Sequence, residues 1–259
     1  MACNYNYIVL FKSQRNRLDL WNLGAIERRT QAECKLEWHG GLIISMGFKD
    51  NDTIYMFTER DFSLFSISKQ KCIDSRILPR GNDDEWSSSS TEYQRGIGTI
   101  DDKHWYHIYS NRSTHWTLQT NSFEKNSANI DNRDLTRLFP DVSRFIHFCV
   151  NDRIFHYLVQ MNDLTYAVVT HDSPPVILKD AQQPLTIYSS YNQILKQYIC
   201  FINDPSIDIL HIVTKDRYLQ SHSLTAYAIC YYGENNELMI VTNNSIGSIN
   251  LNQLNLVFS

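Results

Sequence analysis

Six β-hairpin patterns, spread along the whole chain, constrain its fold more than any other feature. Each consists of a short apolar run, a polar turn and a second apolar run, which is typical of two antiparallel strands. Residues 52–67, DTIYMFTERDFSLFSI, show the pattern clearly. The expected hairpins lie near residues 7–23, 54–67, 105–121, 154–169, 209–224 and 238–251. The chain is therefore predicted to be an all-β repeat protein.

The repeat length indicates the architecture. Six repeats in 259 residues give about 43 residues each, within the ~40–45 of a four-stranded propeller blade. The first strands of several hairpins are apolar at consecutive positions, as in Ile54-Tyr-Met-Phe, so both of their faces are expected to be buried. Neighbouring blades bury the inner strands of a propeller in this way. We expect a single β-propeller domain over residues 1–259, with six blades of three to four antiparallel strands.

Several segments between the hairpins carry their own predictions. Apolar runs starting at Cys34, Cys72 and Val176 are expected fourth strands, whereas the fifth repeat leaves no room for one after Leu224. Residues 79–95 are acidic and serine-rich and are expected to form a mobile surface loop, and residues 132–139 favour a short helix. A further irregular strand pair is expected near Leu185. An open ring would expose strand edges, so residues 254–258 are expected to pair beside residues 7–11 and close it.

One hairpin carries a family resemblance. Arg17-Leu-Asp-Leu-Trp-Asn-Leu-Gly resembles the third strand of a WD40 repeat, with Trp21 at the tryptophan position and Asn22 where the aspartate would stand. The same position in the other repeats holds Phe65, Gln119, Ala167, His222 and Ile249. No Gly-His pair precedes any of the expected blades. The resemblance implies a diverged WD40-like propeller.

Composition argues against several classes of protein. The formal net charge is −4, and no run of five like charges occurs, so nucleic-acid binding is not expected. No apolar stretch approaches a membrane span and the start does not resemble a signal peptide. We expect a cytoplasmic protein without membrane contact, with the nucleus as an alternative location.

The six cysteines include no Cys-x-x-Cys pair and are expected to be reduced and mostly buried. Cys149, Cys200 and Cys230 fall near equivalent places on three expected first strands. Because packed sheets lie ~10 Å apart, beyond the ~7 Å between α-carbons that a disulfide spans, no disulfide is expected among them.

The sequence contains no recognisable catalytic motif, and no cofactor or metal is predicted. His104 and His107 are three apart on an expected strand, so their side chains are expected on opposite faces. Acidic residues precede the hairpins, and we interpret them as turn formers, with a calcium or catalytic carboxylate cluster as the alternative. They are Asp50, Asp52, Asp101, Asp102, Asp152, Asp204 and Asp208.

Charge differs between the two sets of turns. The turns inside the hairpins carry seven basic and four acidic side chains, a net +3, and the turns before them carry three basic and nine acidic ones, a net −6. Strand alternation places the two sets on opposite faces. Basic side chains recognise carboxylate and phosphate, so we expect a basic face to bind protein partners. The predicted partner-binding residues are Arg17, Arg60, Arg112, Arg217, Lys12 and Lys215.

The predicted function is that of a non-catalytic protein-interaction scaffold, which binds acidic or phosphorylated protein segments. Two alternatives come from other classes. One is a propeller-type glycoside or ester hydrolase with carboxylates in its channel. The other is the substrate-receptor part of a ubiquitin-ligase subunit.

Overall fold

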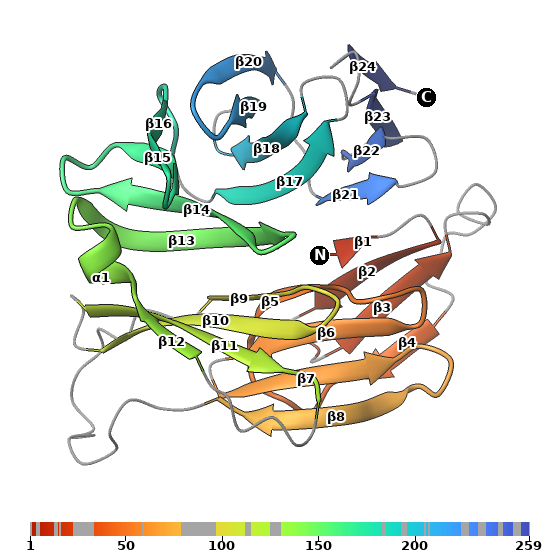
Figure 1. Ribbon diagram of the computed structural model, residues 1–259. Helices are drawn as coiled ribbons and strands as arrows, with labels where there is room; N and C mark the ends of the chain where they lie inside the picture. The colour runs from red at the N-terminus through yellow and green to blue at the C-terminus, as the bar shows by residue number, and fades with distance from the viewer. Residues whose placement is uncertain are drawn as a thin grey trace. The chain divides into compact units, whose positions relative to one another are not determined.

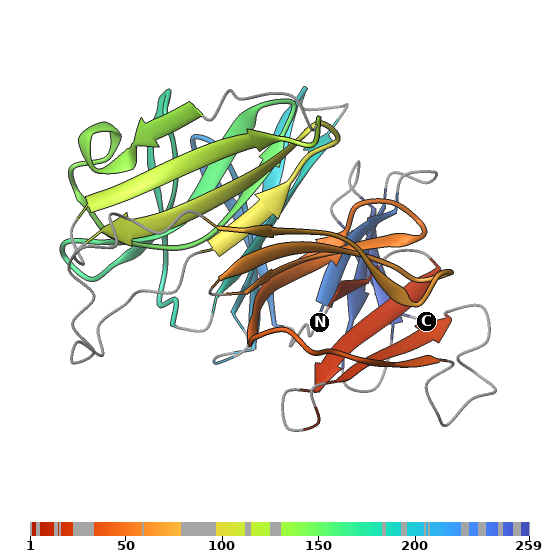
Figure 2. The same cartoon turned by 90° about the horizontal axis from the view of Figure 1, so that it is seen from below.

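The computed structural model describes residues 2–3, 6–12, 15, 17–22, 34–58, 60–78, 97–111, 115–124, 131–182, 185–192, 196–204, 206, 208–223, 228–232, 237–242, 246–250 and 255–258. These residues contain twenty-four strands and one short helix. They divide into two compact units, Met1–His39 with Arg144–Ser259, and Gly40–Ser143. The strands form six separate antiparallel sheets of four strands each (Figures 1 and 2).

The larger unit holds four of these sheets, each built from consecutive strands. The first sheet consists of β1 (Ala2–Cys3), β2 (Tyr7–Lys12), β3 (Arg17–Asn22) and β4 (Cys34–Glu37). The fourth consists of β13 (Val142–Asn151), β14 (Ile154–Met161), β15 (Tyr166–Thr170) and β16 (Ser173–Leu178). The fifth consists of β17 (Thr186–Asn192), β18 (Gln197–Asp204), β19 (Ile209–Thr214) and β20 (Tyr218–Ser223). The sixth consists of β21 (Ala228–Tyr232), β22 (Glu237–Val241), β23 (Ile246–Asn250) and β24 (Asn255–Phe258).

The smaller unit holds the second and third sheets. The second consists of β5 (Ile43–Phe48), β6 (Thr53–Thr58), β7 (Asp61–Ser66) and β8 (Lys71–Ile77), drawn in orange in Figure 2. The third consists of β9 (Ile97–Ile100), β10 (His104–Asn111), β11 (His115–Ser122) and β12 (Asp131–Asp134). The all-β prediction is therefore confirmed. The prediction of one ring of six blades is not, because the larger compact unit comprises four blades and the other two sheets belong to a separate unit.

The fifth repeat differs from its expected register. In the other sheets the predicted hairpin is formed by the second and third strands, such as β6 and β7. In the fifth sheet residues 209–224 fall on β19 and β20, the third and fourth strands, because β17 adds a strand before β18. The fifth sheet therefore has a fourth strand, β20, which the sequence was expected to lack. The strand signal near Leu185 corresponds to its first strand, β17. His222 lies on a fourth strand, so its expected equivalence to Trp21 on the third strand β3 is wrong.

The pairing predicted for the C-terminal strand is also wrong. β24 pairs with β23, and β2 has β1 on one side and β3 on the other, so no edge of β2 is open to it. The first sheet already has a first strand of its own in the two-residue β1. β1 lies against β21, so the first and sixth sheets meet through their first strands without sharing one.

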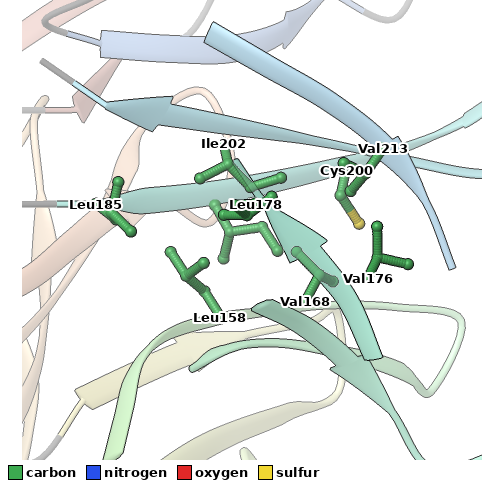
Figure 3. Close-up of a cluster of buried hydrophobic side chains, with 9 residues drawn as sticks. Leu158, Val168, Val176, Leu178, Leu185, Cys200, Ile202 and Val213 are labelled. Carbon is green, nitrogen blue, oxygen red and sulfur yellow. The ribbon is translucent and has the colours of Figure 1, made fainter. Parts of the chain in front are cut away.

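Apolar side chains pack between neighbouring sheets in both units. In the larger unit a buried cluster includes Leu158 of β14, Val176 of β16 and Ile202 of β18, and joins the fourth and fifth sheets (Figure 3). In the smaller unit Phe62 of β7 stacks on Trp105 of β10, with ring centroids 5.1 Å apart. Within each unit, neighbouring sheets thus bury apolar faces against each other, as blades do.

The predicted short helix is confirmed and is shorter than expected. α1 (Leu135–Leu138) begins after Asp134, whose side chain accepts a hydrogen bond from the Arg137 N–H at 3.0 Å. An aspartate at this position satisfies a free amide of the first turn. The residues before it form β12 in place of helix. No helix among the described residues is long and apolar enough to span a bilayer. The predicted mobile loop 79–95 lies outside the described residues.

Candidate interaction surface

The basic residues predicted to bind partners stand in three different situations. Arg17 and Lys215 form ion pairs within the chain, and Arg60 and Arg217 are exposed. Lys12 ends β2, but its side chain and the whole of Arg112 lie outside what the structure describes. The exposed pair is therefore the part of the set that is free to meet another molecule.

Arg17 is held by a buried acid. Its Nε lies 2.5 Å from Oδ1 of Asp19, and a terminal nitrogen donates to Oδ2 at 2.9 Å. The Asp19 side chain is 2% exposed and that of Arg17 20%. A charge this deeply buried requires a close opposite charge. Arg17 is thus committed to neutralising Asp19, and a role in binding partners would compete with that contact.

Arg60 projects from a turn whose backbone is fixed from inside the hairpin. Thr58, at the end of β6, accepts hydrogen bonds at Oγ1 from the N–H groups of Arg60 at 3.1 Å and Asp61 at 2.9 Å. The Leu78 N–H donates to the Arg60 carbonyl at 2.7 Å. The turn is therefore pre-organised, while the Arg60 side chain is exposed and makes no ion pair with a described residue.

Arg217 occupies a similarly fixed turn in the larger unit. The Thr214 N–H donates to the Arg217 carbonyl at 2.8 Å, and the Thr214 hydroxyl donates to Oδ1 of Asp216 at 2.7 Å. Lys215 of the same turn lies 3.4 Å from Oδ2 of Asp172, on the turn between β15 and β16. Both side chains of that ion pair are about half exposed, so it is weak.

The strand order shows that the prediction of one basic face is wrong within the larger unit. The shifted register makes residues 215–217 a connection between third and fourth strands, like the connection that carries Asp172. Lys12 and Arg17 flank a connection between second and third strands. Connections alternate between the two ends of a sheet, so these two basic sets belong to opposite ends.

The interpretation of the acidic residues as turn formers is confirmed at two equivalent positions. Asp50 Oδ1 accepts from the N–H of Thr53 at 2.7 Å, and Asp101 Oδ1 accepts from the N–H of His104 at 2.7 Å. Asp101 also accepts from the Tyr106 hydroxyl at 2.6 Å. Burial raises the pKa of Asp101, but the hydrogen bonds to its carboxylate outweigh burial and lower it.

Asp204 also holds turns through hydrogen bonds to its carboxylate, although it is buried. It is fully buried at the end of β18 and accepts from the N–H of Gln182 at 2.7 Å and from the Ser206 hydroxyl at 2.5 Å. The carboxylate therefore ties two connections together. None of these contacts places two of the acids side by side as a catalytic pair.

The two histidines of β10 separate as expected. His107 is 5% exposed and its ring stacks on Phe57 at 6.3 Å, whereas His104 is partly exposed and lies 3.4 Å from Asp101. No group of three or more His, Cys, Asp or Glu side chains suited to a metal ion occurs among the described residues.

A cluster of side chains around Cys149, which the sequence did not predict, lies between the fourth and fifth sheets. Cys149 of β13 packs against the buried cluster that contains Cys200 of β18, and His156 and Ser189 lie beside Cys149. The sequence predicted that Cys149 and Cys200 lie at equivalent places on the first strands of two sheets, too far apart for a disulfide. That premise is wrong because Cys200 is on a second strand. Only the extra strand signal near Leu185 could have indicated it.

Comparison with known proteins identifies the class of protein as a β-propeller. No family model and no curated protein sequence matches the chain. Among solved structures, Hsv2 of Kluyveromyces marxianus is 7% identical with a TM-score of 0.50, over 96% of this chain and 70% of that one. BBS1N, solved in complex with ARL6DN, is 10% identical with a TM-score of 0.53, over 93% of this chain and 73% of that one.

A third similar structure is the dihydro-heme d1 dehydrogenase NirN, in complex with DHE. It is 9% identical with a TM-score of 0.54, over all of this chain, which spans 64% of the length of that protein. Identities this low show a shared fold alone. These propellers serve different functions, which is common for one fold.

Proposed function

We propose that this propeller is a non-catalytic protein-interaction scaffold, which binds acidic or phosphorylated protein segments through exposed basic turns. The observation that carries the proposal is the exposure of Arg60 and Arg217 on turns that Thr58 and Thr214 hold fixed. A guanidinium on a pre-organised turn offers bidentate hydrogen bonds to carboxylate or phosphate and loses little freedom on binding. One such residue lies in each compact unit.

We further propose that the propeller is of the WD40 type. Trp21 lies on β3, the third strand of its sheet, and pairs across the hairpin with Ile8. Phe65 on β7 pairs with Ile54 in the equivalent way. The repeated position is therefore occupied by a large apolar side chain in these two blades. The structure of BBS1N with ARL6DN is an example of a similar fold that binds a protein.

The test is binding of the full chain to defined anionic peptides. Fluorescence anisotropy with a labelled polyglutamate peptide, and with a phosphoserine peptide of equal length, should show binding that weakens as salt rises. Arg60→Glu or Arg217→Glu should each weaken it by about tenfold, since a charge-assisted hydrogen bond contributes ~1.5–3 kcal/mol. The two probes separate a carboxylate preference from a phosphate preference.

Arg133→Glu is the matched control. Arg133 is exposed on β12 in an ion pair with Asp131 at 3.1 Å, and its reversal changes the net charge by the same amount. Affinity should stay close to that of the original chain. Equal weakening by all three reversals, or no binding of either peptide, would contradict the proposal. Arg17→Glu is unsuitable for this experiment because it would bury two acids together.

A further inference from the structure

Two free thiols belong to the same packed region between the fourth and fifth sheets. Cys200 is fully buried on β18 and belongs to the apolar cluster in Figure 3, where it lies between Val213 and Val176. Cys149, on β13, is partly exposed and packs against the same cluster. The Cys149 residue is thus less deeply buried than Cys200.

Hydrogen bonds and strand pairing hold the surrounding segments in place. Ser189 of β17 pairs in register with Cys200 on β18. The side-chain amide of Asn151, at the end of β13, donates to the Ser189 carbonyl at 2.9 Å and also to its hydroxyl. The strand that carries Cys149 is therefore tied to the sheet that carries Cys200.

A buried histidine completes the group. His156 of β14 is 1% exposed, and neither of its ring nitrogens makes a hydrogen bond of normal geometry with a described residue. Its ring packs edge-on against Tyr198, with centroids 5.8 Å apart, and the Tyr198 hydroxyl donates to Asp152 at 2.5 Å. His156 thus lies beside Cys149 inside the core.

The two thiols differ in acidity. Burial raises the pKa of Cys149, but the neighbouring polar side chains of Cys200, His156 and Ser189, together with the charge of His156, outweigh burial and lower it. For Cys200, burial and then the neighbouring Cys149 both raise the pKa. Cys149 is thus the better nucleophile of the two near neutral pH, because the thiolate is the reactive form.

We propose that Cys149 and Cys200 form a redox-active pair, in which Cys149 reacts with a peroxide and Cys200 then closes a disulfide between β13 and β18. The Cys149 thiolate attacks the peroxide, takes one oxygen and releases hydroxide or alkoxide, which is protonated to water or alcohol. The sulfur of Cys200 then displaces hydroxide from the sulfenic acid of Cys149, and its proton leaves with that hydroxide as water. The two sulfurs together lose two electrons to one peroxide.

Peroxide treatment of the full chain followed by alkylation and peptide mass spectrometry tests the proposal. A Cys149–Cys200 cross-linked peptide should appear and disappear again on reduction with dithiothreitol. The matched control is Cys72, an exposed thiol on β8, and Cys149 should react about tenfold faster, because an ordinary thiol is only a few per cent thiolate at neutral pH. Cys200→Ser should leave Cys149 as a sulfenic acid that a dimedone probe labels.

His156→Gln should slow the oxidation of Cys149 and leave that of Cys72 unchanged, and circular dichroism of each variant reports whether it is folded. Equal reactivity of Cys149 and Cys72 in the folded chain would overturn the proposal. So would a sulfenic acid on Cys149 that persists in the original chain, or cross-links that join Cys149 to other cysteines. If a variant fails to fold, the cross-link and the ratio of the Cys149 and Cys72 oxidation rates in the original chain still test the proposal.

Discussion

Gly98 of β9 lies with its α-carbon directly against the ring of Phe57. A Cβ added at Gly98 would come within 2.4 Å of that ring, far inside van der Waals contact. Phe57 is fully buried and packs against Phe62 with ring centroids 4.9 Å apart. Glycine at this position therefore permits the second and third sheets to pack through an aromatic side chain.

Gly98→Ala should lower the free energy of unfolding by about 1–3 kcal/mol, the usual cost of overpacking a core. Gly41→Ala is the matched control, because its Cβ would meet only Thr58, at 3.7 Å. Urea denaturation of both variants measures the effect through the midpoint. Equal midpoints for the two alanine variants would show that the Phe57 ring moves aside without cost.

Arg17→Ala should destabilise the protein by about 3–5 kcal/mol, because it removes the arginine that neutralises the buried Asp19 carboxylate. The comparison is Arg133→Ala, which breaks an ion pair with both side chains more than half exposed and should change stability by less than about 1 kcal/mol. Thermal melting of the two variants separates the buried pair from the exposed one. If the two melting temperatures agree, Asp19 has found another partner.

Acid should destabilise the protein through His107. Burial lowers the pKa of His107 from 6.5 to about 4, so it is neutral when folded and takes up a proton more readily when unfolded. The stability that depends on this neutral form is complete above pH 6.5 and is lost as pH falls from 6.5 toward 4. His107 alone should contribute up to about 1.4 kcal/mol per pH unit to the slope.

Urea denaturation at a series of pH values through that window measures this slope. His107→Gln should reduce the slope but not abolish it, because burial also lowers the pKa of His147 from 6.5 to about 4, whereas His115→Gln, which changes a half-exposed histidine of β11, should leave it unchanged. An identical slope in the original chain and the His107 variant would assign the acid sensitivity to other groups.

Ile212→Asp should unfold the larger unit, because Ile212 of β19 is fully buried and a buried unpaired charge outweighs the ~1.5–3 kcal/mol that the apolar side chain contributes. Ile77→Asp, at a position of β8 that is 80% exposed, is the control and should stay folded. Circular dichroism and gel filtration compare the two. A cooperatively melting, soluble Ile212 variant would show that β19 does not belong to the core.

Local patterns predicted most of the strands. The hairpins, the fourth strands at Cys34 and Cys72 and the capped helix after Asp134 all depend on residues close in sequence, whose periodicity and turn chemistry are visible directly. The fifth sheet was misjudged because β17 falls where the repeat pattern suggested a connection, so that β18 was taken for the first strand. Its strands are ordinary, and only their pairing order shows which of them begins the sheet.

The candidate sites depended on more distant relationships. The sequence alone determined that the chain is all-β, that its turns are polar and that Asp50 and Asp101 shape two of them, because these properties arise from neighbouring residues. The tertiary structure decided that Arg17 neutralises Asp19, that Lys215 and Arg217 lie on a connection between third and fourth strands, and that Cys149 packs against the cluster that contains Cys200. A shift of one strand within the fifth sheet moves its turns to the opposite end of that sheet, so these contacts follow from strand pairing and from burial.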